Sequence, residues 1–371
     1  MALSADVVVI GAGIIGCASA YFLAQGGRRV ILVERDDIAS GTASASGGWV
    51  IIQDKETPDG VAFARESRRL YDRLQEEAGV PLHRAGGLIL ATSDLDLARL
   101  RTQAVTASAG GLAVELLDAA ALRDLEPALS PEVRQGLFCA DEATVDPPQV
   151  CRALVRGAQQ RGAQLLTRSP AVGITVSRDA VTEVQTTTHR IVTSAVVCAC
   201  GVWSPAIGRL VGVEIPVIPR RGHIVVTEPL SLAGRPMLEA GYLEGSGDSQ
   251  AEDPHGLRFV LQPRVDGRSL VGSSREFRGF ERDPDPDLVR QLWMRAVRFV
   301  PALARTRIES TIVGLRPYTP LGRPIIGWAG PQGFLVATGH EGEGITLAPI
   351  TGKLVEDLVA GRITQTGYEL H

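Results

Sequence analysis

Several features that mark particular classes of protein are scarce in this sequence of 371 residues. Only Lys55 and Lys353 are lysine among its 38 basic residues, and the formal net charge is -4. A protein with this balance is not expected to bind nucleic acid or an anionic membrane through a broad basic surface. The first six residues, MALSAD, contain no basic side chain, so they lack the positive start of a secretory signal.

One long stretch of the chain contains no charged residue, but it does not predict a membrane span. Residues 7–24 carry no charge over 18 positions, a length close to that of a transmembrane helix. This stretch starts with β-branched residues, contains glycines, and is followed after one turn by a second β-branched run. We therefore expect no transmembrane segment and a cytoplasmic protein.

Cysteine is also sparse, with five residues that lie mostly in apolar segments: Cys17, Cys139, Cys151, Cys198 and Cys200. The spacing of Cys198 and Cys200 is too close for the usual zinc or redox motifs, so neither a metal site nor a disulfide framework is predicted. Hydrophobic residues make up 44% of the chain and charged residues 22%, which is typical of a globular protein long enough for two domains.

The strongest positive signal is DVVVIGAGIIGCASAYFLAQGGRRVILVER at residues 6–35. It predicts a strand at 7–10, a GxGxxG turn, a helix at 14–24 and a second strand at 30–33. Gly11 allows a tight turn, Gly13 lets the backbone approach a pyrophosphate, and Gly16 lets the helix pack on the strand. Glu34, at the end of the second strand, is placed to accept hydrogen bonds from ribose hydroxyls. The stretch therefore predicts dinucleotide binding at a helix N-terminus.

The rest of the chain alternates helical and strand patterns. Helices are predicted over 61–78, 95–109, 119–125, 149–161, 286–299 and 344–360. Strands are predicted over 86–92, 136–139, 195–200, 222–227, 308–313 and 333–338, with an antiparallel meander over 172–176, 181–186 and 190–192. Alternation over 257–273 with VDG at 265–267 indicates a hairpin, and 245–253 is a polar loop. This order predicts an α/β fold whose domains are interleaved.

A second glycine-rich segment, GFLVATGHEGEGITLAPIT at 333–351, reads as a buried strand, a turn and a helix. A second helix N-terminus would therefore point at something bound, and a flavin ring that gains electron density on reduction suits that position.

Together the motifs resemble the D-amino-acid oxidase superfamily of FAD flavoproteins, which includes glycine and sarcosine oxidases. They are GAGIIG with Glu34 and Arg35, GTASASGG at 41–48, CGVWS at 200–204, GLRPYTPLGRPIIG at 314–327 and TGHEGEGI at 338–345. The resemblance implies a Rossmann-like FAD-binding domain over 1–85, 142–215 and 307–371. It implies an α+β substrate domain, built on an antiparallel sheet, over 86–141 and 216–306.

The resemblance also implies which residues hold FAD. The residues that would contact it are Gly11, Gly13, Ile15, Gly16, Glu34, Arg35, Ser44, Ser46, Gly48, Trp49, Val172, Gly201, Trp203, Gly339, His340, Gly342, Gly344, Ile345 and Thr346. Val172 would meet adenine through its backbone. We expect His340 to pack or hydrogen-bond as a structural residue.

Arg316 is the expected substrate residue, because relatives that oxidise amino acids pair an arginine of the GLRP motif with the substrate carboxylate. A planar guanidinium suits that bidentate contact, although an ordinary surface ion pair is the alternative reading. Orientation and charge stabilisation would supply most of the rate of hydride transfer from an amine to the flavin. Further residues that could shape the pocket are Trp49, Tyr242, Gln53, Lys55, His223 and Arg275.

The sequence departs from this family pattern in three places. Glycine oxidase has an arginine and a bulky residue in the turn where this chain has Glu341, Gly342 and Glu343, so a second carboxylate contact is not implied. The oxygen-activating lysine of sarcosine oxidase falls near Leu270 here. The cysteine that tethers flavin in that enzyme should fall within 316–318, where there is none, so noncovalent FAD is predicted.

Two functions follow as hypotheses. The first is FAD-dependent oxidation of a small amino acid or secondary amine of the glycine, sarcosine, proline or hydroxyproline type. The second is a flavin-bearing subunit of an electron-transfer complex, with little activity alone. The acidic turn resembles that of hydroxyproline dehydrogenase, opine oxidase and hydrogen cyanide synthase, which leaves open an acceptor protein or quinone and association with the inner face of a membrane.

Overall fold

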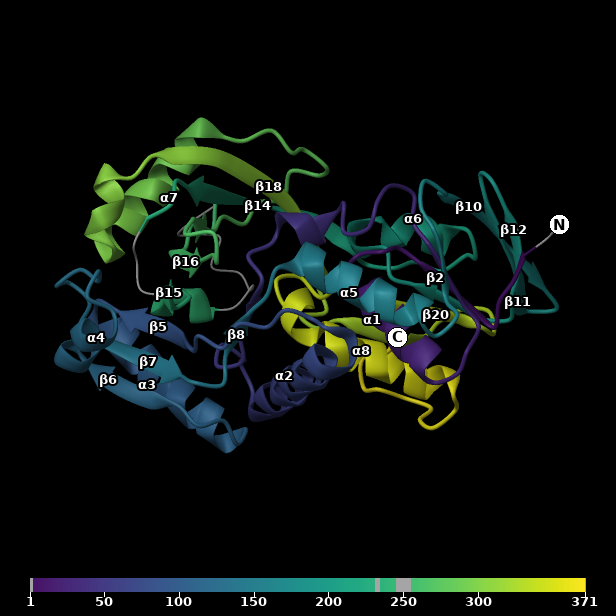
Figure 1. The fold of residues 1–371 in the computed structure, drawn as a ribbon, viewed down its shortest axis with the longest axis horizontal. Coiled ribbons are helices and arrows are strands. Elements are labelled where there is room, and N and C mark those ends of the chain that lie inside the picture. Colours follow the sequence, from purple (N-terminus) through teal and green to yellow (C-terminus); the bar gives the residue numbers. More distant parts are fainter. Residues whose placement is uncertain (1–2, 231–233, 245–254, 371) are drawn as a thin grey trace.

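The computed structural model describes residues 3–230, 234–244 and 255–370, arranged in two lobes that lie side by side (Figure 1). A six-stranded and a four-stranded sheet form the lobe on the right, and an eight-stranded sheet forms the lobe on the left. The predicted polar loop at 245–253 lies outside the described residues. In the described part of the chain, no helix combines the length and apolarity needed to cross a bilayer.

The six-stranded sheet carries the predicted N-terminal motif at its centre. Its order is β19 (Ile325–Trp328), β20 (Phe334–Thr338), β13 (Val196–Cys198), β2 (Val7–Ile10), β3 (Val30–Val33) and β9 (Gln164–Leu166). All neighbours pair in parallel except β19 with β20. The carboxyl ends of β2 and β20 therefore meet at one edge, which brings the first and last glycine-rich turns together.

Both faces of this sheet are covered, which is why its central strands β2, β3 and β13 are apolar throughout. Three helices, α1 (Ile14–Gln25), α5 (Pro147–Gln159) and α8 (Gly344–Val359), form a layer in which α1 packs against both others. Val7 and Val9 of β2 belong to the core on that side, and Val8 and Ile10 to the core on the other. The opposite layer is the four-stranded sheet.

The four-stranded sheet contains the predicted meander, formed by β10 (Ala171–Ser177), β11 (Ala180–Thr186) and β12 (Arg190–Val192). The short strand β1 (Leu3–Ser4) joins β12 in parallel. A short helix that was not predicted, α6 (Ser204–Arg209), follows β13.

The eight-stranded sheet is antiparallel apart from one parallel pair, β15 with β5. Its order is β18 (Ile308–Tyr318), β14 (Ile218–Thr227), β17 (Ser269–Gly272), β16 (Val260–Pro263), β15 (Met237–Glu239), β5 (Gly87–Ala91), β7 (Gln135–Cys139) and β6 (Glu115–Asp118). One core on this sheet includes α7 (Pro286–Phe299) and α4 (Ala119–Leu125), and another includes α3 (Asp94–Ala109). The predicted α/β class with an antiparallel second sheet is confirmed.

Helix α2 (Pro58–Ala78) contacts α8 of one lobe and α3 of the other. It begins three residues earlier than predicted, because Thr57 caps it through the backbone N–H of Gly60 and Pro58 fits the first turn. Helix α5 likewise begins at Pro147, two residues early, with Asp146 accepting a hydrogen bond from the Gln149 N–H. A two-stranded ladder of β4 (Trp49–Val50) and β8 (Ala143–Thr144) completes the described sheets.

Strand β18 is five residues longer than predicted and carries the GLRP motif. It pairs with β14 in one ladder that runs from Ile218 opposite Tyr318 to Thr227 opposite Ile308. Pro317 can lie in this strand because β18 is at the sheet edge, where a missing N–H is tolerated. The assignment of segments to two domains stays a prediction, and by sheet pairing β18 joins the eight-stranded sheet rather than the segments grouped with it after residue 307.

Candidate active site

A cavity of about 720 Å³ lies between the two lobes and is lined from both. The six-stranded sheet lines the cavity with the turn after β2, the end of β3, the segment after β13 and the turn after β20. The eight-stranded sheet lines it with parts of β14, β16, β17 and β18. Ligands of open parallel sheets bind outside the carboxyl ends of the strands, so the position of this cavity fits the predicted site.

The dinucleotide end of the cavity is organised by Glu34. One carboxylate oxygen accepts a hydrogen bond of 2.7 Å from the Ala12 N–H and the other accepts one of 2.9 Å from the Asp36 N–H. The guanidinium of Arg35 lies 4.0 Å from the ring centroid of Trp203 and closes the side of this end. These contacts fix an acidic side chain beside the turn, as a ribose site requires.

The glycines of the first turn show that the turn leaves space for a ligand. Gly11 has a φ of 104°, a conformation that favours glycine. A Cβ on Gly16 would lie 1.8 Å from the carbonyl oxygen of Gly11, so Gly16 is needed for helix packing. A Cβ on Gly13 would meet no atom within 4 Å and would project into the cavity. The turn therefore fits a bound pyrophosphate at the N-terminus of α1.

The second glycine-rich turn places the N-terminus of α8 at the same cavity. Gly339 has a φ of 77°, and His340, Gly342, Gly344 and Ile345 line the cavity wall. The His340 Nε2 atom hydrogen-bonds Thr351 Oγ1 at 2.9 Å, and burial lowers the pKa of His340 to about 3. A neutral imidazole with a fixed partner agrees with the structural role expected for this residue.

The buried state of His340 should make the protein less stable in mild acid. Unfolding restores the ordinary pKa near 6.5, so below this pH the unfolded state binds a proton that the folded state does not. Stability therefore falls as the pH falls from about 6.5 toward 3, by about 2 kcal/mol between pH 7 and pH 5 from this side chain. Urea denaturation at both pH values should show a smaller loss for His340→Gln than for wild type. Equal losses would contradict this account.

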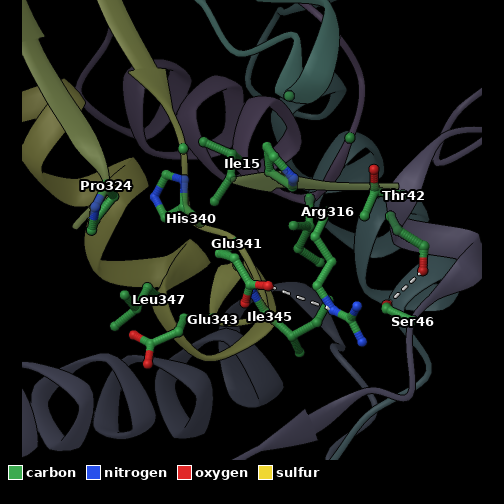
Figure 2. A pocket seen from close by; sticks show the side chains of 18 of the residues that line it. Ile15, Thr42, Ser46, Arg316, Pro324, His340, Glu341, Glu343, Ile345 and Leu347 are labelled. Atoms are coloured by element: carbon green, nitrogen blue, oxygen red, sulfur yellow. Dashed lines mark hydrogen bonds and ion pairs between the residues drawn. The ribbon is translucent and has the colours of Figure 1, made fainter. Parts of the chain in front are cut away.

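Arg316 lies on β18 with its side chain in the cavity (Figure 2). Its Nη1 donates a hydrogen bond of 2.9 Å to the backbone oxygen of Ser274. The guanidinium lies close above Gly222 of β14, where a Cβ would come within 2.3 Å of Nη1. Gly222 thus leaves room for the guanidinium, and the Ser274 contact fixes its orientation, so part of its donor edge can face a ligand.

Glu341 lines the cavity and points toward Arg316 (Figure 2). Its Oε1 lies 4.0 Å from Arg316 Nε and 3.5 Å from Arg220 Nη1. Burial alone would raise the pKa of Glu341, but the guanidinium groups of Arg316, Arg275 and Arg220 lower it. Glu341 is therefore an anion that already faces the guanidinium predicted to bind substrate.

Lys55 is one of only two lysines in the chain, and it is buried against the cavity. Its Nζ lies 2.5 Å from Asp54 Oδ1 and 3.2 Å from Glu343 Oε1. Burial lowers the pKa of Lys55, but the two carboxylates raise it by more, so the net direction is upward. Lys55 is therefore held as a cation between Asp54, which the sequence analysis did not single out, and Glu343.

The other predicted pocket residues divide into two groups. Trp49, Tyr242 and Arg275 line the cavity, with the Arg275 guanidinium 4.4 Å from the ring centroid of Tyr242. Gln53 and His223 are fully buried but do not line it. His223 hydrogen-bonds the side chain of Ser274, the residue whose backbone oxygen accepts the hydrogen bond from Arg316. Leu270, near which the oxygen-activating lysine of sarcosine oxidase is expected to fall, forms part of the apolar wall.

Glu142 is a buried residue that the sequence analysis missed. One of its oxygens accepts hydrogen bonds from the Ile52 and Gln53 N–H groups at 2.7 and 2.9 Å. The other accepts from Trp49 Nε1 at 3.0 Å and Gln53 Nε2 at 3.2 Å. Burial raises its pKa to about 7, while these donors favour the ionised form. Glu142 thereby fixes the Trp49 ring in the cavity wall.

Replacing the Glu142 carboxylate by an amide should destabilise the protein. In Glu142→Gln one carboxylate oxygen is replaced by an NH₂ group, which cannot accept the hydrogen bonds that this oxygen now receives from N–H donors. The free energy of unfolding should therefore fall by roughly 2–3 kcal/mol. Asp141→Asn makes the same chemical change on an exposed neighbour and should have little effect. Denaturant titration of both variants measures the difference, and an unchanged midpoint for Glu142→Gln would contradict the role given to this carboxylate.

Most of the residues predicted to hold the cofactor meet at this cavity. Those that line it are Gly11, Gly13, Ile15, Glu34, Arg35, Ser46, Trp49, Gly201, Trp203, Gly339, His340, Gly342, Gly344 and Ile345. Their contacts with FAD stay predictions, and so do the roles proposed for Arg316, Tyr242 and Trp49.

The remaining predicted residues do not line the cavity. Gly16 packs beneath the first turn, and a Cβ on Gly48 would lie 2.1 Å from the backbone oxygen of Val145, the residue after β8. The Ser44 side chain is exposed, and its hydroxyl donates to a backbone oxygen within its own turn. Val172 is 53% exposed beside Ala171, which does line the cavity. The Thr346 hydroxyl accepts a hydrogen bond from the backbone N–H of Ile51, the residue after β4, and donates one to the Ile51 carbonyl oxygen.

Comparison with known proteins agrees with the predicted resemblance. The model of the family "FAD dependent oxidoreductase" (DAO) matches residues 6–358. The glycine oxidase of Bacillus licheniformis is 30% identical over 98% of this chain and 95% of its own. The hydrogen cyanide synthase subunit HcnC of Pseudomonas protegens is 28% identical over 95% of this chain and 92% of its own.

A solved structure extends the agreement to the fold. The glycine oxidase from Bacillus cereus ATCC 14579 superposes with a TM-score of 0.86 at 27% identity, over 97% of this chain and 96% of that one. The match thus includes both lobes and the cavity between them. The chain belongs to the FAD dependent oxidoreductase (DAO) family, and it is an oxidoreductase whose cofactor is FAD.

Proposed function

We propose that this protein oxidises a small amino acid or secondary amine, of the glycine, sarcosine, proline or hydroxyproline type, to the corresponding imine. The observation that carries the proposal is the position of Arg316, a fixed guanidinium inside the cavity that is predicted to hold FAD. A guanidinium in such a place suits the carboxylate of an amino acid. The similarity to glycine oxidase supports a substrate of this size.

The side chains of the cavity would bind and orient such a substrate. Arg316 would hold its carboxylate, and the apolar wall of Leu238, Val260 and Leu270 would exclude water from its carbon atoms. Bound FAD would supply the two-electron acceptor for the hydride of the α C–H bond. His340 stays neutral near pH 7 and is held by Thr351, so the proposal gives it no proton to carry.

Anaerobic reduction of the bound flavin tests this function. D- and L-amino acids, sarcosine and other N-alkyl amines are mixed with the purified holoprotein, and bleaching of the flavin absorbance is followed. At least one small amino acid or secondary amine should reduce the flavin on the timescale of catalytic turnover. A flavin that dithionite reduces but no compound of the panel does would refute the proposal. Repeating the panel with oxygen or a dye separates an oxidase from a dehydrogenase.

The second candidate is a flavin-bearing subunit of a larger dehydrogenase. The observation that favours it is the similarity to a protein described as a subunit, HcnC, together with the acidic residues Glu341 and Glu343 in the turn before α8. An acceptor protein or quinone, and association with a membrane face, belong to this candidate. Affinity purification that retains an iron–sulfur protein, with turnover only in the complex, would favour it over the first.

We expect FAD to be bound without a covalent link. The segment 316–318, where a tethering cysteine would fall, contains none. Acid precipitation of the holoprotein should therefore release the yellow colour into the supernatant, where its absorbance is measured. Colour that remains in the washed pellet would show a covalent bond.

A further inference from the structure

Three arginines surround Glu341 at the substrate end of the cavity. Arg220 and Arg316 lie directly opposite each other on β14 and β18, so both side chains project from the same face of the sheet. Arg275 follows β17, and its guanidinium contributes with the other two to the field at Glu341. The Glu341 carboxylate faces Arg220 at 3.5 Å and Arg316 at 4.0 Å through the same oxygen.

The other oxygen of Glu341 is held in place by the chain itself. It accepts a hydrogen bond from the backbone N–H of the next residue, Gly342. The Glu341 backbone N–H donates to the carbonyl oxygen of Pro317, at 3.1 Å, so the turn is tied to β18 just beyond Arg316. The carboxylate is thus fixed where an anionic group of a ligand could otherwise bind between Arg220 and Arg316.

Glu341 occupies a backbone position that does not favour it. Its φ is 46°, in the left-handed region where glycine is accommodated without strain and other residues lose of order 1 kcal/mol. A glycine at this position would relieve that strain. The side chain therefore gives the site something that glycine would not, and a negative charge between two guanidinium groups is what the contacts show.

We propose that Glu341 restricts the site to monocarboxylic substrates, because its carboxylate occupies the place between Arg220 and Arg316 where a second acid group would bind. This inference rests on the proposed function, in which Arg316 holds one substrate carboxylate. Glu341 is then a specificity residue of the same pocket. Amino acids with a second carboxylate on the nitrogen substituent or side chain are excluded by repulsion and by lack of space.

Two variants and one control test the inference through binding of anions that the enzyme cannot oxidise. Glu341→Gly removes the charge and the side chain and relieves the positive φ, whereas Glu341→Gln removes only the charge. Glu343→Gln makes the same change of charge two residues away, at a carboxylate that pairs with Lys55 instead of Arg316. Circular dichroism and flavin content confirm that each variant is folded and loaded.

Acetate and malonate serve as probes, and their dissociation constants are measured by flavin absorbance changes and by calorimetry. Wild type should bind acetate and should bind malonate at least 10-fold more weakly. In Glu341→Gly and Glu341→Gln malonate should bind at least 10-fold more tightly than in wild type, with acetate affected less than 3-fold. Glu343→Gln should keep the wild-type ratio.

The outcomes separate this inference from the function on which it rests. If wild type does not bind acetate, the carboxylate site at Arg316 is refuted, and the inference falls with it. If acetate binds but the ratio of the two constants is unchanged in both Glu341 variants, only the inference is refuted. An equal change in Glu343→Gln also refutes it, because the effect would then come from net charge and not from the position between the arginines.

Discussion

Arg316→Leu should lower kcat/KM for an amino acid substrate by roughly 100- to 1,000-fold, which corresponds to about 3–4 kcal/mol. The guanidinium is held by the Ser274 oxygen and faces the cavity beside Glu341, so its loss would remove the donor that is proposed to hold the substrate carboxylate. The Glu341 carboxylate would add repulsion, because Arg316 would no longer offset its charge. Steady-state kinetics, or the rate of anaerobic flavin reduction, measures the change.

Two comparisons keep this expectation specific. Arg307→Leu makes the same substitution near the start of β18, where the side chain is 84% exposed and pairs with Glu228, and should leave kcat/KM within about 2-fold. An amine that lacks a carboxylate should be oxidised equally well, or equally poorly, by wild type and Arg316→Leu. A general loss for both kinds of substrate would mean that Arg316 supports the fold and not the carboxylate.

Gly13→Ala should weaken FAD binding by roughly 10- to 100-fold while leaving the stability of the apoprotein nearly unchanged. Gly13 has an extended φ of -73° and ψ of -177°, which alanine adopts easily, and its Cβ would meet no protein atom within 4 Å. The added methyl group would instead occupy space at the N-terminus of α1, where the pyrophosphate is expected. Fluorescence titration of apoprotein with FAD measures the affinity.

Gly16→Ala is the matched substitution three residues later and should behave differently. Its Cβ would lie 1.8 Å from the Gly11 carbonyl oxygen, so the turn and α1 would have to move apart. We expect the apoprotein to lose about 3 kcal/mol or more of unfolding free energy, and FAD to bind at least as weakly as in Gly13→Ala. If Gly13→Ala also lowered apoprotein stability by this amount, the open space at Gly13 would not be a ligand site.

The two glycine-rich turns and the fold class could be predicted from the sequence because the interactions that define them are local. A GxGxxG turn between a β-branched strand and a helix depends on residues within a few positions of one another. The same holds for the strand, turn and helix around Gly339. The order of these motifs with GLRP also indicated the family, and the family comparison confirmed it.

Several short strands, like the short helix α6, were not predicted from the sequence pattern. Strands β9, β15 and β19 have three or four residues each and exist because a neighbouring strand supplies their hydrogen bonds. The length of β18 was underestimated for a similar reason. Its last five residues contain arginine and proline, which carry little strand signal, and they are held in the sheet by pairing with β14.

By itself the sequence predicted that a dinucleotide would meet a helix N-terminus, that the last glycine-rich turn would approach the same ligand, and that Arg316 would hold a substrate carboxylate. Only the tertiary structure decided what surrounds that arginine. Gly222 makes room for it, Arg220 lies beside it through strand pairing across 96 residues, and Glu341 faces it from another element. These contacts depend on strand register and on the approach of two lobes, which no local pattern encodes, so the position of Glu341 between Arg220 and Arg316 became visible only in three dimensions.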